Sequence, residues 1–128
     1  MNPSGKKLLI VDGDSSWREL LGEFFEMNSF QAILAGSGIE ALSALDSNPD
    51  LVLLDLALPE MNGVALIREI HRRHPETTPR ILVCGNGPRP LEIAALIDQV
   101  LPKPLSLPLL LSEVTRLLKL PRKSNHSG

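Results

Sequence analysis

Charged side chains follow several short apolar segments of this sequence, and their types suit phosphoryl chemistry. Asp12 and Asp14 come after the first apolar run, Asp55 comes directly after the third, and Lys103 follows the last. Carboxylates held close together repel each other, so they need a cation or a proton between them. Mg²⁺ prefers oxygen ligands, and a nearby lysine binds an anion as a point charge. Together these groups are suited to accepting a phosphoryl group on a carboxylate.

Each of these residues also has a plainer interpretation. Asp14 is equally suited to capping the helix that follows it. A single lysine usually lies on the protein surface. Asp55 is the strongest candidate, because four consecutive apolar residues precede it and Leu56 follows it.

The elements that must position these side chains alternate between strand and helix. Apolar runs predict five strands, at residues 7–11, 30–35, 51–54, 81–84 and 99–101. The capping box Ser16-Trp-Arg-Glu19 predicts the start of the first helix. Its predicted apolar face consists of Leu20, Leu21, Phe24 and Met27. Further helices are predicted at residues 39–45, 64–74, 91–96 and 106–120.

This alternation predicts a doubly wound α/β domain with a parallel sheet. The central strands are apolar throughout, as strands covered on both faces are. In such sheets, ligands bind beyond the carboxyl ends of the strands. The residues at these ends are Asp12, Gly13, Asp14, Asp55, Cys84 and Lys103. We expect the carboxylates and the lysine among them to converge on one small pocket.

Composition limits the remaining possibilities. The chain has 128 residues, 43% of them hydrophobic, and its net charge is −2. This is enough for one domain, and it gives no basic field to hold nucleic acid. A single cysteine and the absence of a signal sequence or a long apolar run predict a cytoplasmic location with no membrane span. There is no tyrosine, and all four aromatic residues precede residue 31.

One segment resembles the phosphoacceptor region of bacterial response-regulator receiver domains. It is Leu53-Leu-Asp-Leu-Ala-Leu-Pro-Glu-Met-Asn-Gly63, and it is supported by Leu9-Ile-Val-Asp12 and by Lys103-Pro104. The resemblance implies a flavodoxin-like (βα)₅ fold with five parallel strands in the order 2-1-3-4-5 and five helices. It covers residues 7–120 of a single domain, 1–128, and leaves polar tails at 1–6 and 121–128.

The resemblance also implies a role for each matching residue. Asp55 would accept a phosphoryl group from a histidine kinase, a phosphotransfer protein or a small phosphodonor. Asp12 and the carbonyl group of Ala57 would join Asp55 in holding Mg²⁺. Lys103 would pair with Asp55 or with the bound phosphoryl group, and a cis peptide bond would precede Pro104.

Three positions depart from the family pattern. In the family, all three take part in the conformational switch that follows phosphorylation. Gly13 replaces an acidic metal ligand, so we expect Mg²⁺ binding to be weak or absent, with Asp14 as a candidate replacement. Cys84 replaces a hydroxyl residue, and a thiol is a poorer donor. Val100 replaces an aromatic residue that turns inward on activation. The segment from Cys84 to Lys103 is also short, which predicts a truncated fourth helix.

These departures leave other functions open. The chain could be a pseudo-receiver, a protein-binding module that works without phosphorylation. A more remote alternative is a phosphatase resembling the haloacid dehalogenases, with Asp12 as nucleophile and Asp14 as acid and base. Cys84 could be a redox sensor, although packing is favoured because acidic neighbours oppose a lowered thiol pKa. We otherwise expect no turnover of a substrate.

The expected partners are proteins. A histidine kinase or a phosphotransfer protein would supply the phosphoryl group. On the last helix, Leu109 and Leu120 lie off the apolar stripe, where they could contact a second copy of the chain or a target protein. Scattered surface leucines are also ordinary. Arg122 and Lys123 are too few charges for nucleic-acid binding, and no output domain is evident.

Overall fold

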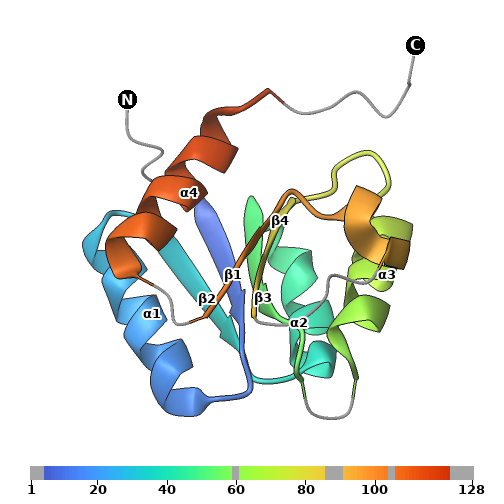
Figure 1. Ribbon diagram of the computed structural model, residues 1–128, viewed down its shortest axis with the longest axis horizontal. Helices are drawn as coiled ribbons and strands as arrows, with labels where there is room; N and C mark the ends of the chain where they lie inside the picture. The colour runs from blue at the N-terminus through green and yellow to red at the C-terminus, as the bar shows by residue number, and fades with distance from the viewer. Residues whose placement is uncertain (1–4, 59–60, 86–90, 104–105, 122–128) are drawn as a thin grey trace.

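A parallel sheet forms the centre of the computed structural model (Figure 1), which describes residues 5–58, 61–85, 91–103 and 106–121. Within these residues the strand order is β2-β1-β3-β4-β5, the order that the family resemblance implied. Neighbouring strands all pair in parallel. The strands are β1 (Lys7–Val11), β2 (Gln31–Ala35), β3 (Leu51–Asp55), β4 (Arg80–Cys84) and β5 (Gln99–Leu101).

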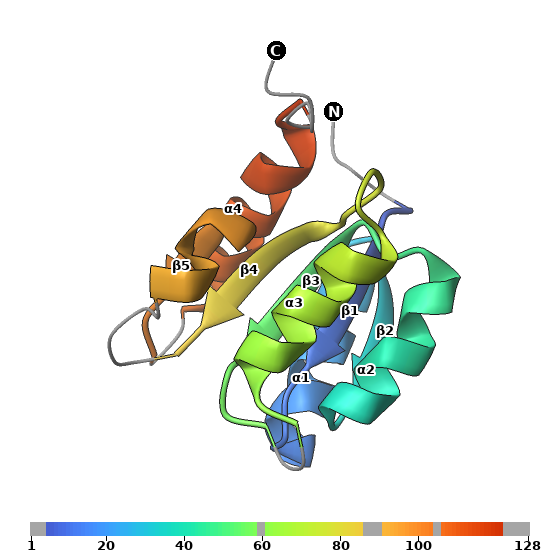
Figure 2. The same ribbon diagram turned by 90° about the vertical axis from the view of Figure 1, so that its right-hand side faces the viewer.

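Helices cover both faces of this sheet (Figures 1 and 2). One face packs against α1 (Ser15–Met27) and α4 (Leu107–Lys119). The other packs against α2 (Gly38–Ala44), α3 (Gly63–Arg73) and the 3₁₀ segments η1 (Leu45–Ser47) and η2 (Leu91–Leu96). The fold is therefore the doubly wound α/β arrangement expected from the sequence.

Alternation along the strands explains why the sheet is buried on both sides. In β1, Leu8 and Ile10 face one helix layer, whereas Leu9 and Val11 face the other. All four are at most 1% exposed. Because side chains alternate between faces, only a continuous apolar run can satisfy both layers. The two cores hold the sheet rigid, so the carboxyl ends of its strands are fixed relative to one another.

The five-helix expectation is corrected at the fourth position. In the described residues the segment that follows β4 contains the 3₁₀ helix η2 in place of an α-helix. This agrees with the prediction that the fourth helix is truncated. Ile93 of η2 is fully buried, whereas Leu91 is exposed. Ile93, with the partly buried Leu96 and Ile97, anchors the segment against the core that α2 and α3 cover.

The capping box predicted at Ser16 was wrong and the alternative cap at Asp14 is confirmed, while the predicted apolar face of α1 is correct at Leu21 and Phe24 but wrong at Leu20 and Met27. The helix is capped by Asp14, whose carboxylate accepts a hydrogen bond from the Trp17 amide, and not by a capping box at Ser16. Leu21 and Phe25 are buried, whereas Met27 is 85% exposed. Phe25 packs edge-on against Phe30, with ring centroids 5.6 Å apart. This tertiary contact selects the buried stripe among adjacent apolar residues.

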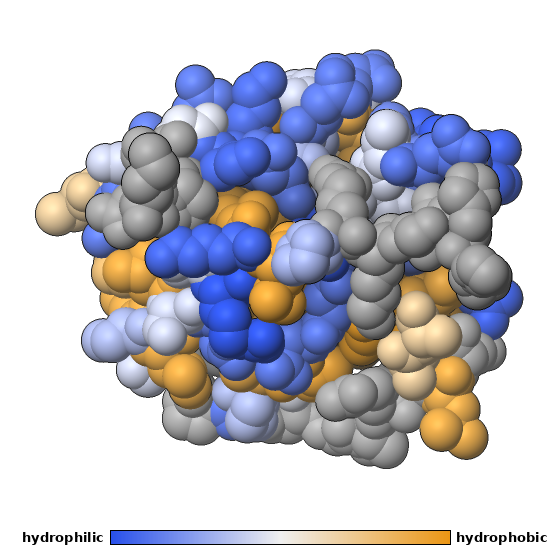
Figure 3. All heavy atoms as spheres, turned by 90° about the horizontal axis from the view of Figure 1, so that it is seen from above, coloured by the Kyte–Doolittle hydropathy of each residue, from blue (hydrophilic) through white to orange (hydrophobic). Residues whose placement is uncertain are grey.

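Some expectations fall outside the described residues. They include the peptide bond before Pro104 and most of both polar tails, residues 1–4 and 122–128. Across the described ranges, no helix has the length and apolar character needed to cross a bilayer. Seen from above, the described residues show hydrophilic side chains that alternate with separate apolar areas (Figure 3).

Candidate phosphoacceptor site

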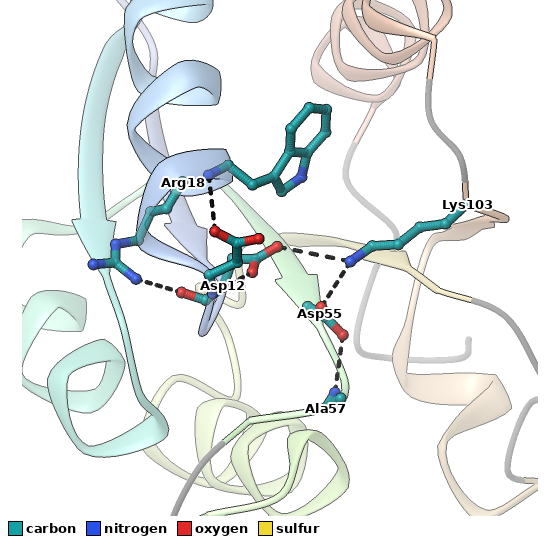
Figure 4. Close-up of polar contacts among 7 residues, drawn as sticks. Asp12, Arg18, Asp55, Ala57 and Lys103 are labelled. Atoms are coloured by element: carbon teal, nitrogen blue, oxygen red, sulfur yellow. Dashed lines mark hydrogen bonds and ion pairs between the residues drawn. The ribbon is translucent and has the colours of Figure 1, made fainter.

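A pocket of about 480 Å³ opens where the strands end, and it collects the predicted chemical groups (Figure 4). Its walls are Asp12, Gly13, Asp14, Trp17, Asp55, Ala57 and Lys103. These residues come from three separate parts of the chain, which the parallel sheet brings together at its carboxyl edge. Trp17, on the first turns of α1, was not predicted as part of the site. Cys84 and Val100 do not line the pocket.

Asp55 is the last residue of β3, and both of its carboxylate oxygens are bonded. Oδ2 accepts a hydrogen bond from the Lys103 ammonium group at 2.8 Å. Oδ1 accepts one from the amide of Ala57 at 2.9 Å. The side chain is 16% exposed, so it is held firmly at the pocket surface and remains reachable from solvent.

Lys103 lies between two carboxylates. Its Nζ atom is 2.8 Å from Asp55 Oδ2 and 3.9 Å from Asp12 Oδ2. The hydrogen bond to Asp55 raises the pKa of Lys103 above its ordinary value, against the opposing effect of burial. The ammonium group therefore stays charged at neutral pH and partly neutralises the acidic pocket.

Asp12 is the buried carboxylate of the site. It is 5% exposed, and its Oδ1 atom accepts a hydrogen bond from the amide of Asp14 at 2.9 Å. Burial raises the pKa of Asp12 above 3.8, although the Asp14 amide and the charge of Lys103 act in the opposite direction. A carboxylate that is costly to ionise gains from a cation placed beside it.

Gly13 and Asp14 follow Asp12, where the family pattern has a second acidic metal ligand. Gly13 is exposed and has no side chain to offer. Asp14 lies on the pocket wall, but its Oδ1 atom accepts the hydrogen bond from the Trp17 amide at 3.2 Å. This cap favours a structural role for Asp14, both over replacement of the metal ligand and over the acid–base role in the phosphatase alternative.

Among the described residues, no three acidic, histidine or cysteine side chains gather as a metal cage. The oxygen ligands available to a cation are the carboxylates of Asp12 and Asp55 and the main-chain carbonyl of Ala57. Mg²⁺ is commonly held by one or two carboxylates and completes its shell with water. The donor set therefore fits Mg²⁺ held largely by water.

Cys84 and Val100, the other two positions that depart from the family pattern, both pack against hydrophobic core residues. Cys84 ends β4 opposite Asp55 and is 4% exposed within the core beneath α1 and α4. Burial raises the pKa of its thiol to about 12, which argues against a reactive thiolate. Val100 is half-buried and packs against the core on the opposite face of the sheet.

The Cys84 thiol should make the protein lose stability at alkaline pH. Its pKa rises from 9.0 to about 12 on folding, so the folded state retains a proton that the unfolded state releases. This contribution is complete below pH 9 and is lost as the pH rises toward 12. Between pH 8 and pH 10 the loss is about 1.3 kcal/mol, measured by urea unfolding. Cys84→Ala should lack this increment, and equal losses in both proteins would contradict the assignment.

Comparison with known proteins agrees with this fold and site. Residues 8–115 match the sequence profile of the response regulator receiver domain family. The chain therefore belongs to this family and is a receiver domain of the two-component type. Receiver domains generally bind Mg²⁺ at the phosphorylation site and interact with histidine kinases or phosphotransfer proteins.

The chain is similar to parts of two longer regulatory proteins. The chain is 37% identical over 103 residues to the Transcriptional regulatory protein CpxR of Escherichia coli strain K12, covering 78% of this chain and 44% of that protein. It is 34% identical over 106 residues to the Regulator of RpoS of the same organism, covering 79% and 31%. The chain thus spans less than half the length of these curated relatives.

Solved receiver structures have the same fold. A response regulator receiver domain (CheY-like) from Methylobacillus flagellatus is 30% identical, with a TM-score of 0.79 over 91% of this chain and 100% of that one. The chemotaxis response regulator CheY4 of Vibrio cholerae superposes with a TM-score of 0.80 over 89% of this chain and 99% of that one. At 23% identity, the second likeness concerns the fold alone.

Proposed function

We propose that this domain accepts a phosphoryl group on Asp55. One observation carries the proposal: Lys103 Nζ lies 2.8 Å from Asp55 Oδ2 at the edge of an open pocket. A carboxylate beside a fixed cation is both a nucleophile and the start of a binding site for the transferred group. Donors would be the phosphohistidine of a histidine kinase or phosphotransfer protein, or a small acyl phosphate.

The chemistry is a displacement at phosphorus. A carboxylate oxygen of Asp55 forms the new O–P bond while the N–P bond of phosphohistidine breaks, and the departing imidazole takes a proton from solvent. Lys103 remains protonated and moves its hydrogen bond from the carboxylate to the phosphoryl oxygens. The product is an acyl phosphate on Asp55, and no separate substrate is turned over.

Mg²⁺ would be held by Asp12, Asp55 and the Ala57 carbonyl, where it would neutralise charge on the phosphoryl oxygens. We expect this binding to be weak. Gly13 supplies no ligand, Asp14 caps α1, and the Lys103 ammonium group already lies within 4 Å of both carboxylates. Each of these features lowers the gain from adding a second cation.

Acetyl phosphate with Mg²⁺, followed by intact-mass measurement, tests the proposal. We expect the wild type to gain the mass of one phosphoryl group, and only at elevated Mg²⁺. Asp55→Asn should gain nothing, whereas Asp46→Asn, a change at an exposed aspartate in η1, should behave as the wild type. A wild type that gains no mass at any Mg²⁺ concentration would sink the proposal, and complete modification at ordinary Mg²⁺ would contradict the weak site.

The second candidate function is a phosphorylation-independent pseudo-receiver that binds proteins. The buried Cys84 thiol favours it, because its place in the core offers no hydroxyl group to a phosphoryl oxygen. Two exposed apolar side chains suggest one binding surface for a second copy or a target. They are Leu109 on α4 and Leu120 at its C-cap, which are 50% and 44% exposed. Absence of phosphorylation in the mass experiment would favour this alternative.

A further inference from the structure

The side chain of Arg18 reaches from α1 to the end of β1 and contacts the main chain of Asp12 (Figure 4). Its Nη1 atom donates a hydrogen bond to the carbonyl oxygen of Asp12 at 2.6 Å. The guanidinium group is partly buried and is not among the residues that line the pocket. Because it binds the carbonyl and not the carboxylate, its direct effect is on where Asp12 lies.

Gly36 leaves the space that this guanidinium group occupies. A Cβ atom at residue 36 would lie 2.9 Å from Arg18 Nη1 and 3.2 Å from Cζ. The amide of Gly36 donates to Glu40 Oε1 at 2.8 Å, which holds the turn after β2 in place. We call the contact between Arg18 and Gly36 the guanidinium seat.

The hydrogen bond from Arg18 completes a set that engages the amide, the carbonyl and one carboxylate oxygen of Asp12. Its amide donates to the carbonyl of Ala35 at 3.1 Å, and its carbonyl accepts from Arg18. Its Oδ1 atom accepts from the amide of Asp14. The remaining polar atom, Oδ2, lies 3.9 Å from Lys103 Nζ, on the side of the pocket where Asp55 lies.

We propose that Arg18, held in the guanidinium seat against Gly36, is a positioning residue that aims Asp12 Oδ2 into the phosphoacceptor site. This rests on the proposed function, in which Asp12 takes part in holding Mg²⁺. A group that orients a ligand through a hydrogen bond typically changes metal affinity ten- to a hundredfold when it is removed. The seat would therefore set how well this two-carboxylate site binds its cation.

Two different changes break the same contact. Arg18→Met keeps most of the aliphatic stem and removes the donors, whereas Gly36→Ala keeps Arg18 but fills its seat. Arg18→Met should weaken Mg²⁺ binding about tenfold, and Gly36→Ala, which displaces only the flexible end of the Arg18 side chain, by up to the same factor. The double variant should bind no more weakly than Arg18→Met, because both changes act on one contact. Emission of Trp17, the sole tryptophan and a pocket wall, follows the Mg²⁺ titration.

Matched controls separate positioning from general damage. Arg116→Met removes an arginine on α4, and Gly22→Ala adds a Cβ against Leu34 at a similarly tight 3.1 Å. Both should leave Mg²⁺ affinity unchanged. Arg18→Lys, which retains a charged donor, should recover part of the lost affinity.

A second readout needs no metal. The ¹⁵N amide signal of Gly13 belongs to the peptide unit whose carbonyl Arg18 binds, so it should shift in Arg18→Met and Gly36→Ala and stay in place in the controls. An unmoved Gly13 signal, or a moved signal with unchanged Mg²⁺ affinity, would overturn the positioning role. A wild type that binds no Mg²⁺ while the Gly13 signal still moves would instead contradict the metal-assisted function and leave the seat supported.

Discussion

Replacing Lys103 by methionine should slow phosphoryl uptake about a hundredfold while tightening the binding of Mg²⁺ about tenfold. Removing one preorganised donor that faces developing negative charge typically costs about a hundred- to a thousandfold in rate. In the wild type, however, the same ammonium group lies 2.8 Å and 3.9 Å from the oxygens that an added cation needs. Lys103 therefore aids the transferred group and competes with the metal.

Solvent screening keeps the expected gain in Mg²⁺ affinity below the Coulomb energy of the charges involved. Two unit charges 4 Å apart interact by about 4 kcal/mol at an effective dielectric constant of 20. Because the Lys103 side chain is 34% exposed, solvent screens much of this interaction. Loss of Lys103 should also raise the pKa of Asp12 further, since Lys103 now lowers it.

Trp17 emission measures Mg²⁺ affinity in the Lys103→Met protein, and intact mass after acetyl phosphate treatment measures uptake. Lys119→Met, at an exposed position on α4, is the matched loss of one lysine and should change neither quantity. Weaker Mg²⁺ binding in Lys103→Met would show that the ammonium group does not compete for the carboxylates. An unchanged rate of uptake would remove Lys103 from the chemistry.

The strands and the acceptor were accessible from the sequence because their signals are local. A continuous apolar run such as Leu51–Leu54 has few interpretations, and the residue that ends it must emerge at the carboxyl edge. Asp55 and Lys103 were found by this reasoning, and the structure joins them directly. Burial of Cys84 followed from its place at the end of a similar run.

The parts that sequence reasoning missed depend on contacts between distant residues. In α1, the adjacent pairs Leu20–Leu21 and Phe24–Phe25 allow two overlapping apolar stripes. The edge-on contact of Phe25 with Phe30 decides between them, and spacing alone does not contain that information. Arg18 was missed for the same reason, since its two contacts lie six residues before it and eighteen after it.

We expect the second large effect, on the free energy of unfolding, at Arg80, the first residue of β4. Replacing it by methionine should lower the free energy of unfolding by about 3 kcal/mol, because the change leaves a partly buried carboxylate without its partner. Arg80 Nη1 lies 3.4 Å from Asp98 Oδ1, and the two side chains are 12% and 21% exposed. The Asp98 Oδ2 atom accepts from the amide of Ile81, which keeps the carboxylate inside.

The same guanidinium group also binds the end of the last helix. Its Nη2 atom donates to the carbonyl oxygens of Leu120 and Pro121, both at 2.7 Å. Leu120 caps α4 and Pro121 follows it, where main-chain carbonyls have no helical partner, so Arg80 satisfies acceptors that would otherwise need water. One side chain thereby ties the start of β4, the residue before β5 and the end of α4 together.

Urea unfolding measures the predicted loss, and Arg116→Met provides the comparison. Arg116 pairs with Glu113 on the surface of α4 with 48% of its side chain exposed, and exposed pairs contribute at most about 1 kcal/mol. Hydrogen exchange at the Leu120 amide should also quicken in Arg80→Met and not in Arg116→Met. If the two variants were equally stable, the contacts of Arg80 would contribute no more to the free energy of unfolding than an exposed ion pair does. A loss near 3 kcal/mol with faster exchange at Leu120 would instead show that Arg80 fixes the carboxyl-terminal end of α4 against the sheet.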